Sequence, residues 1–95
     1  MEYVEVYLEA LETFGLDSQI KQTVEECAEL INALCKFQRG RCSFPEVVTE
    51  IADVIIMAHQ MALSFGVEAV EKEIQYKVKR LHGRIQNLKQ KQTEL

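Results

Sequence analysis

The chain has no tryptophan, only one proline and four glycines, and no segment in which apolar and polar residues alternate as they do along a β-strand. It also lacks an apolar run approaching the ~20 residues that a membrane-spanning helix needs. The first ten residues, MEYVEVYLEA, are acidic and do not resemble a signal peptide. These absences argue against β-rich and membrane-spanning folds, and we expect a cytoplasmic protein with no membrane partner.

Cysteine usage and net charge argue against two further classes. The three cysteines, Cys27, Cys35 and Cys42, form no CxxC pair, which indicates reduced thiols rather than a disulfide framework. Zinc binding by these cysteines with His59 or His82 is the less favoured alternative, because no metal-ligand spacing supports it. The formal net charge of −4 argues against non-specific binding to a nucleic acid polymer.

Apolar residues recur at helical spacing, and glycines at positions 15, 40 and 66 divide the chain into four expected helices. Asp17 or Ser18 is expected to cap the second helix. Ser43 and Glu46 form the capping-box pattern S-x-x-E at the start of the third helix, and the fourth begins near Val67. The expected fold is all-α: a four-helix bundle-like protomer that occupies residues 1–95 as a single domain.

The second and fourth expected helices each carry an apolar stripe. The stripe of the second comprises Ile20, Val24, Cys27, Ile31, Leu34 and Cys35, and that of the fourth comprises Val70, Ile74, Val78, Leu81, Ile85 and Leu88. A chain of this length buries only about 60–65% of its unfolded surface, which makes a lone monomer modestly stable. We therefore expect self-association into a homodimer or a homotetramer.

Four acids on the second and third helices lack a basic neighbour. Glu26 and Glu29 are three residues apart, as are Glu50 and Asp53, so each pair lies on one helix face. None of the four has a Lys or Arg three or four positions away, whereas Glu25 has Lys21. Helices joined by a short loop usually run antiparallel, so the two pairs are expected to meet. A solvated acidic face on each helix is the alternative explanation.

Carboxylates that meet in this way need a positive charge. Two unit charges ~5 Å apart repel by about 3 kcal/mol at an effective dielectric constant of ~20. An all-oxygen ligand set favours a hard divalent cation, Mg²⁺, or Mn²⁺ in its place. The chain lacks the Glu-x-x-His motif of di-iron bundles. The sequence therefore predicts a magnesium site formed by Glu26, Glu29, Glu50 and Asp53.

Basic residues follow the acids at two places in the chain. Mg²⁺ held by carboxylates usually also binds substrate phosphates, which Lys and Arg side chains clamp. The first group comprises Lys36, Arg39 and Arg41, from which we select Lys36 and Arg39 as candidate substrate ligands. The second comprises Lys77, Lys79, Arg80 and Arg84 on the last helix.

The stretch EECAE at 25–29, followed twenty residues later by EIAD at 50–53, resembles the EExxE…ExxD pattern of the MazG-like, all-α nucleoside triphosphate pyrophosphohydrolases. The likeness covers roughly residues 18–85 and includes the apolar VIIMAHQMA and the basic YKVKR. It implies an oligomeric helical enzyme that uses Mg²⁺ to hydrolyse nucleoside triphosphates to monophosphate and pyrophosphate. Clearing the nucleotide pool is the role this suggests.

By motif position, the four acids without basic neighbours correspond to the metal ligands. Glu25 is the first acid of the motif, and Glu25 or Glu29 is the candidate to orient or deprotonate the attacking water. Lys77 and Arg80 approximately match basic phosphate-binding positions, although the chain lacks a clear counterpart of the Asn and Tyr-Pro that follow them in the family.

Two alternatives remain open. Phosphoribosyl-ATP pyrophosphohydrolases resemble the same family, but their longer N-terminal pattern is absent here. A non-enzymatic helical interaction module, with the acids as a solvated face, is the alternative from a different functional class.

Overall fold

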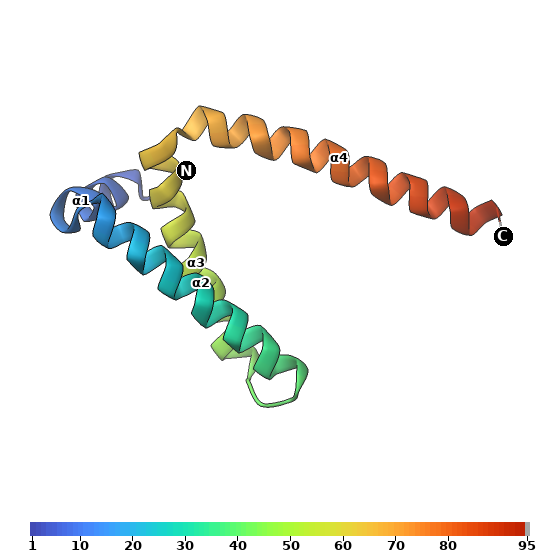
Figure 1. The fold of residues 1–95 in the computed structure, drawn as a ribbon, viewed down its shortest axis with the longest axis horizontal. Helices are drawn as coiled ribbons and strands as arrows, with labels where there is room; N and C mark the ends of the chain where they lie inside the picture. The colour runs from blue at the N-terminus through green and yellow to red at the C-terminus, as the bar shows by residue number, and fades with distance from the viewer. Residues whose placement is uncertain (95) are drawn as a thin grey trace. The chain divides into compact units, whose positions relative to one another are not determined.

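The computed structural model describes residues 1–94. Across them the chain forms α1 (Val4–Phe14), α2 (Leu16–Gln38), α3 (Phe44–Phe65) and α4 (Val67–Glu94), with no β-strand in this described part (Figure 1). The all-α expectation is confirmed. The chain divides into two units: Met1–Ser64, which holds α1, α2 and nearly all of α3, and Phe65–Leu95, which holds α4. The bundle-like arrangement of all four helices stays a prediction.

A single glycine separates α1 from α2. Gly15 has φ 87°, a left-handed conformation that favours glycine, and its N–H donates to the Leu11 carbonyl at 3.0 Å. The Gly15 carbonyl then accepts the N–H of Gln19 at 3.1 Å, which starts α2 at once. The expected cap at Asp17 or Ser18 is therefore wrong: both residues already lie inside α2, and no side chain caps its N-terminus.

A short turn joins α2 to α3. The N–H of Gly40, at φ 72°, donates to the Phe37 carbonyl and that of Arg41 to the Lys36 carbonyl, the pattern of a Schellman motif. The predicted capping box at the start of α3 is confirmed. The Ser43 N–H donates to Glu46 Oε2 at 2.9 Å, and the Glu46 N–H donates to Ser43 Oγ at 3.3 Å.

Within the first unit, α2 and α3 run antiparallel. At one end Gln19 Nε2 donates to Gln60 Oε1 at 2.7 Å, and at the other end the rings of Phe37 and Phe44 lie 5.0 Å apart. The buried and half-buried residues of α2 share one face: Gln19, Thr23, Glu26, Leu30, Ala33 and Phe37. This face carries an acid, and the apolar stripe predicted for α2 lies on the exposed side of the helix.

The third helix, contrary to the count of uninterrupted apolar residues in the sequence, is apolar and long enough to cross a membrane by length and composition alone. Its most apolar 18-residue window has a mean hydropathy of 1.3. The core helix of a soluble protein meets the same criterion. Glu50 and Asp53 are acidic residues within this otherwise mostly apolar helix, and both are half-buried. The expectation of no membrane partner stays a prediction.

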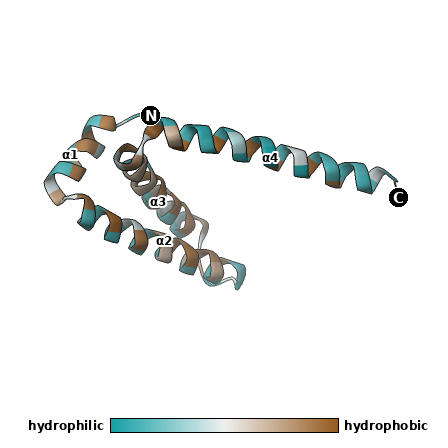
Figure 2. Ribbon diagram, turned by 45° about the horizontal axis from the view of Figure 1, so that its top comes forward, coloured by the Kyte–Doolittle hydropathy of each residue, from teal (hydrophilic) through white to brown (hydrophobic). Residues whose placement is uncertain are grey.

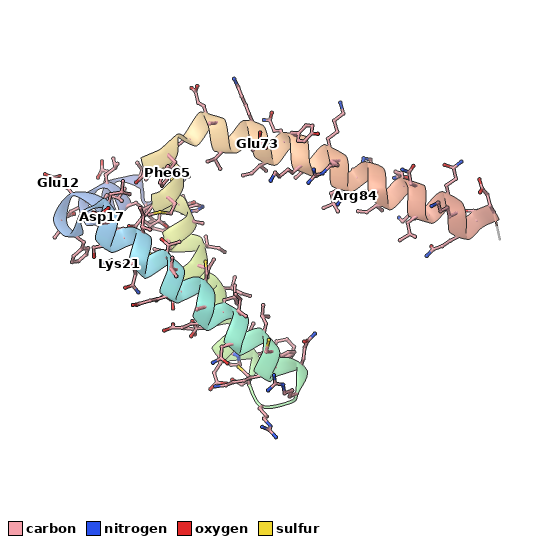
Figure 3. All side chains as sticks on the ribbon, viewed as in Figure 1. Glu12, Asp17, Lys21, Phe65, Glu73 and Arg84 are labelled. Carbon is pink, nitrogen blue, oxygen red and sulfur yellow. The ribbon has the colours of Figure 1, made fainter. Side chains whose placement is uncertain are left out.

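The second unit is a single amphipathic helix. All residues of α4 from 71 to 94 are exposed within the unit, including every apolar residue of its predicted stripe after Val70. Figure 2 shows apolar residues recurring along α4 among polar ones, and Figure 3 shows side chains projecting around it, with Glu73 and Arg84 labelled.

Candidate metal centre

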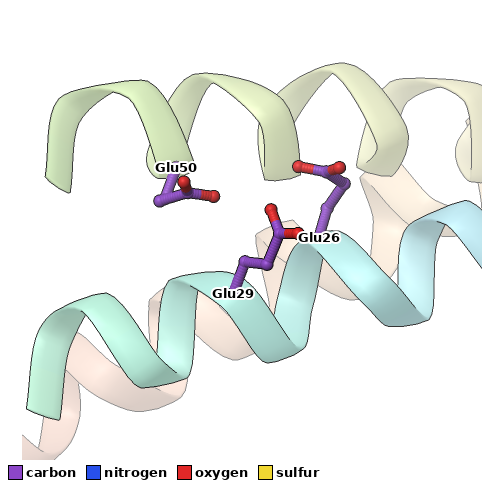
Figure 4. A group of neighbouring side chains, drawn as sticks. All are labelled: Glu26, Glu29 and Glu50. Atoms are coloured by element: carbon purple, nitrogen blue, oxygen red, sulfur yellow. The ribbon is translucent and has the colours of Figure 1, made fainter. Parts of the chain in front are cut away.

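Three carboxylates meet between α2 and α3. One carboxylate oxygen from each of Glu26, Glu29 and Glu50 lies within 4.8 Å of the other two. Glu26 and Glu29 project from successive turns of α2, Glu50 projects from α3, and the three side chains point toward one another (Figure 4). The antiparallel arrangement thus brings three of the four predicted metal ligands into one cluster.

Two oxygens of this cluster are buried without a partner. Oε2 of Glu26 and Oε2 of Glu50 are shielded from solvent and accept no hydrogen bond from any described residue. The other oxygen of Glu26 accepts from Gln22 Nε2 at 2.8 Å. A buried carboxylate oxygen with no donor is costly, so this arrangement favours a proton or a cation at the cluster.

The environment raises the pKa of two of these carboxyls. For Glu26, burial is the main cause, the bond from Gln22 opposes it, and the nearby charges of Asp53 and Glu29 raise the pKa further. For Glu50, burial again comes first, followed by Glu29 and Asp53. Both groups hold a proton more tightly than an exposed glutamate does, and a divalent cation would relieve the same repulsion.

Asp53 and Glu25 occupy different positions relative to the cluster. Asp53 lies outside the group of three clustered oxygens, but it is half-buried on α3, and its charge raises the pKa of both Glu26 and Glu50. Glu25 is exposed and does not belong to the group of clustered oxygens. The structure therefore associates Asp53 with the cluster and leaves Glu25 outside it.

A hollow of about 240 Å³ opens beside the cluster, at the α2–α3 turn. Its lining combines acids and bases: Glu29, Asn32, Lys36, Arg41, Glu46 and Glu50, together with Ala33 and Cys42. Of the two predicted substrate ligands near this turn, Lys36 lines the hollow and Arg39 does not. Arg41 lies there in its place, because the left-handed turn at Gly40 folds the chain back over the end of α2.

The remaining predicted substrate ligands, Lys77 and Arg80, lie on α4 in the second unit. There the Arg80 guanidinium carbon lies 5.9 Å from the centre of the Tyr76 ring, a cation–π contact within one helix. The structure describes these two side chains only within their own unit.

Three polar residues of the hollow were not predicted as site residues: Asn32, Cys42 and Glu46. Glu46 was identified only as a capping residue, and the Ser43 N–H that it accepts is the main cause of its lowered pKa. Burial, followed by the Glu46 carboxylate, raises the pKa of the Cys42 thiol. The three-residue spacing of Glu29 and Asn32 was the one available signal, since both face the same side of α2.

The alternative zinc site receives no support within residues 1–94. Among the described side chains, the group placed to hold a metal is the carboxylate cluster, and no cysteine or histidine belongs to it. His59 is half-buried, and its ring lies 5.6 Å from that of Tyr7 on α1. Both line a separate, mostly apolar hollow of about 410 Å³.

Comparison with protein-family models, with curated proteins and with solved structures found no match to this chain. The likeness to the MazG-like enzymes therefore rests on the motif residues alone.

Proposed function

We propose that this protein is a Mg²⁺-dependent nucleoside triphosphate pyrophosphohydrolase that releases pyrophosphate and a nucleoside monophosphate. One observation carries the proposal: two helices bring buried, unpartnered carboxylate oxygens of Glu26 and Glu50 together with Glu29. Carboxylates this close repel one another, and a bound cation would offset that repulsion. Carboxylate oxygens are ligands suited to Mg²⁺ or Mn²⁺.

The residues present fit such an ion. Two oxygens on opposite sides of Mg²⁺ lie roughly 4 Å apart, since each is bound at about 2.1 Å. The clustered oxygens lie within 4.8 Å of one another, so small side-chain rotations bring them into range. Glu26, Glu29 and Glu50 would hold the ion, and Asp53 completes the predicted ligand set. Bound Mg²⁺ supplies charge neutralisation for a phosphoryl group and lowers the pKa of a coordinated water.

The chain's own bases complete the site. Lys36 and Arg41 line the hollow next to Glu29 and Glu50, so phosphates held there would meet cations on one side and the acidic cluster on the other. Arg is suited to bidentate contact with phosphate oxygens, and Lys acts as a point charge. We assign the terminal phosphates of the substrate to this hollow.

Glu29 is the better candidate of the two carboxylates predicted to handle the water. It is exposed, so it can reach solvent, and it is also part of the cluster, whereas Glu25 lies outside it. A carboxylate in that position can orient the water and accept its proton as the water attacks the α-phosphorus. Pyrophosphate then leaves from the side of Lys36 and Arg41.

In this proposal each protomer is a four-helix bundle-like unit. The protein is a homodimer or homotetramer, and it acts in the cytoplasm. It does not distinguish a phosphoribosyl-ATP substrate from another nucleoside triphosphate, because both require the same attack. The second candidate, a non-enzymatic helical interaction module, is favoured by the exposed apolar residues on α2 and α4.

A pyrophosphate-release assay across ribo- and deoxyribonucleoside triphosphates tests the proposal. We expect release that requires Mg²⁺ or Mn²⁺ and stops with EDTA. Calorimetry with Mn²⁺ alone, at millimolar concentration, separates the two candidates. Metal binding without turnover of any nucleotide would contradict the enzymatic function, and the absence of both would favour the interaction module.

A further inference from the structure

A side-chain amide holds one oxygen of Glu26. Nε2 of Gln22 donates to Oε1 of Glu26 at 2.8 Å. The two residues are four positions apart on α2, so both side chains lie over the same face of the helix. Oε2 of Glu26, by contrast, is buried and has no partner among residues 1–94. The two oxygens of this carboxylate therefore differ: one is bound within the chain, and the other is left for a ligand.

The neighbouring polar side chains of α2 are bonded elsewhere. Thr23 lies three positions before Glu26, but its Oγ1 donates to the Gln19 carbonyl at 2.7 Å. The Gln19 amide donates across the interface to Gln60 Oε1, also at 2.7 Å. Within residues 1–94, Gln22 is therefore the one residue in the turn before Glu26 whose side chain donates to it.

A hydrogen bond of this kind matters for a carboxylate that binds a metal. The last torsion of a glutamate side chain has broad preferences, so a free carboxylate can turn either oxygen toward an ion. A donor on Oε1 restricts that rotation and leaves Oε2 available beside Glu29 and Glu50, whose side chains point toward that of Glu26 (Figure 4). Side chains that bond to metal ligands commonly orient them in this way. The amide is also neutral, so unlike a lysine at this position it does not repel a cation.

We infer that Gln22 is a positioning residue for the metal site: its amide holds Glu26 so that Oε2 is presented to the divalent cation. Gln22 is exposed and lies outside the carboxylate cluster, so it acts through Glu26 and contacts neither the ion nor the substrate. It also lies outside the EExxE…ExxD pattern that contains the four predicted ligands. This inference rests on the proposed function, because it requires the cluster to bind Mg²⁺ or Mn²⁺.

Calorimetry with Mn²⁺ alone tests the inference. Gln22→Met removes the donor but keeps the length and the helix propensity of the side chain. The dissociation constant for Mn²⁺ should rise about 10-fold, the lower end of the range for residues that orient metal ligands. Gln38→Met is the matched control, since Gln38 is an exposed glutamine of the same helix, outside the cluster and the hollow beside it. That control should bind Mn²⁺ within about twofold of wild type.

The metal dependence of turnover separates positioning from a general structural defect. In Gln22→Met, the Mn²⁺ concentration that gives half the maximal rate should also rise about 10-fold, while kcat at saturating Mn²⁺ should match wild type. A structural defect would not be restored by added metal. Circular dichroism and thermal unfolding in EDTA should be nearly the same for wild type and both variants, because the bond to Glu26 is exposed.

The calorimetric results distinguish failure of this inference from failure of the proposed function. Equal Mn²⁺ affinity in wild type and Gln22→Met would overturn the inference and leave the proposed function standing. Equal weakening by Gln22→Met and Gln38→Met would also overturn it, since the effect would not depend on the bond to Glu26. If wild type binds no Mn²⁺ at millimolar concentration, both the inference and the proposed function fail.

Discussion

Carboxylate oxygens of Glu29 on α2 and Glu50 on α3 lie within 4.8 Å of each other across the interface of two antiparallel helices. Further along the same interface, Gln19 and Gln60 are joined by a buried hydrogen bond of 2.7 Å. The end of the interface at Gln19 and Gln60 is thus satisfied internally, whereas the carboxylates between the two ends repel one another. A proton or a metal ion beside Glu29 and Glu50 would offset this repulsion, and the predictions below test which of the two is present.

Asp53→Asn should abolish Mg²⁺-dependent hydrolysis while leaving the helix content nearly unchanged. The substitution removes one predicted ligand and also one charge that raises the pKa of Glu26 and Glu50. Thermal stability without metal should therefore be equal to wild type or higher. Asp17→Asn is the matched control, because Asp17 is an exposed acid at the start of α2. Wild-type turnover by Asp53→Asn would exclude Asp53 from the site.

Glu50→Gln should change how stability depends on pH. The pKa of Glu50 is raised above the ordinary value of 4.5, so the folded chain binds more protons than the unfolded chain just above that value. The stability due to the protonated carboxyl is complete below pH 4.5 and is lost as pH rises through the folded pKa. Glutamine mimics the protonated group, so in EDTA the variant should match wild type near pH 4 and exceed it at pH 7.

Urea unfolding of wild type and of Glu50→Gln, near pH 4 and at pH 7, measures this difference in stability. Glu46 provides the contrast, because its pKa is lowered and its stabilisation is instead lost as pH falls. If Glu50→Gln is less stable than wild type at pH 7 without metal, the carboxylate is not under repulsion.

Arg41→Ala should raise KM for the nucleotide by roughly 10- to 100-fold, the usual range for one charge-assisted hydrogen bond. Arg41 lines the hollow beside the cluster, and Arg39 does not. Arg39→Ala is therefore the matched control and should leave KM within about twofold. Steady-state kinetics on both variants decides between them, and an equal effect would mean that charge alone, without position, matters.

Gln60→Leu should lower the free energy of unfolding by about 1–3 kcal/mol, because it leaves the buried amide of Gln19 without its acceptor. Removing both amides with Gln19→Leu and Gln60→Leu should cost less than the sum of the two single changes. A double-mutant cycle from urea unfolding measures the coupling. Additive effects would show that the two side chains do not depend on each other.

The sequence predicted the features that depend on neighbouring residues. The capping box at Ser43 and Glu46 is local, and its two hydrogen bonds are present. The four helices follow from the helical spacing of apolar residues and from the glycines at positions 15, 40 and 66 that separate them. The meeting of Glu29 and Glu50 follows from spacing on two helices joined by a short turn.

The faces of α2 were harder to predict. Its apolar stripe looks like a core surface in isolation, yet Gln19 and Ala33 are the buried residues and Val24 is exposed. Local hydrophobicity cannot reveal this, because the choice depends on residues of α3 such as Gln60. The presence of Arg41 rather than Arg39 in the lining of the hollow was also hard to predict. It depends on the left-handed turn at Gly40.

Hydrolysis in ¹⁸O-labelled water tests the central claim most directly, because it reports which phosphorus the activated water attacks. The cluster of Glu26, Glu29 and Glu50 includes no cysteine, serine or histidine, and Cys27 lies on the exposed side of α2, away from it. Direct attack at the α-phosphorus puts the label in the nucleoside monophosphate and leaves pyrophosphate unlabelled. Label in pyrophosphate, or release of orthophosphate with a nucleoside diphosphate, would contradict the proposed pyrophosphohydrolase activity even if the cluster binds Mg²⁺.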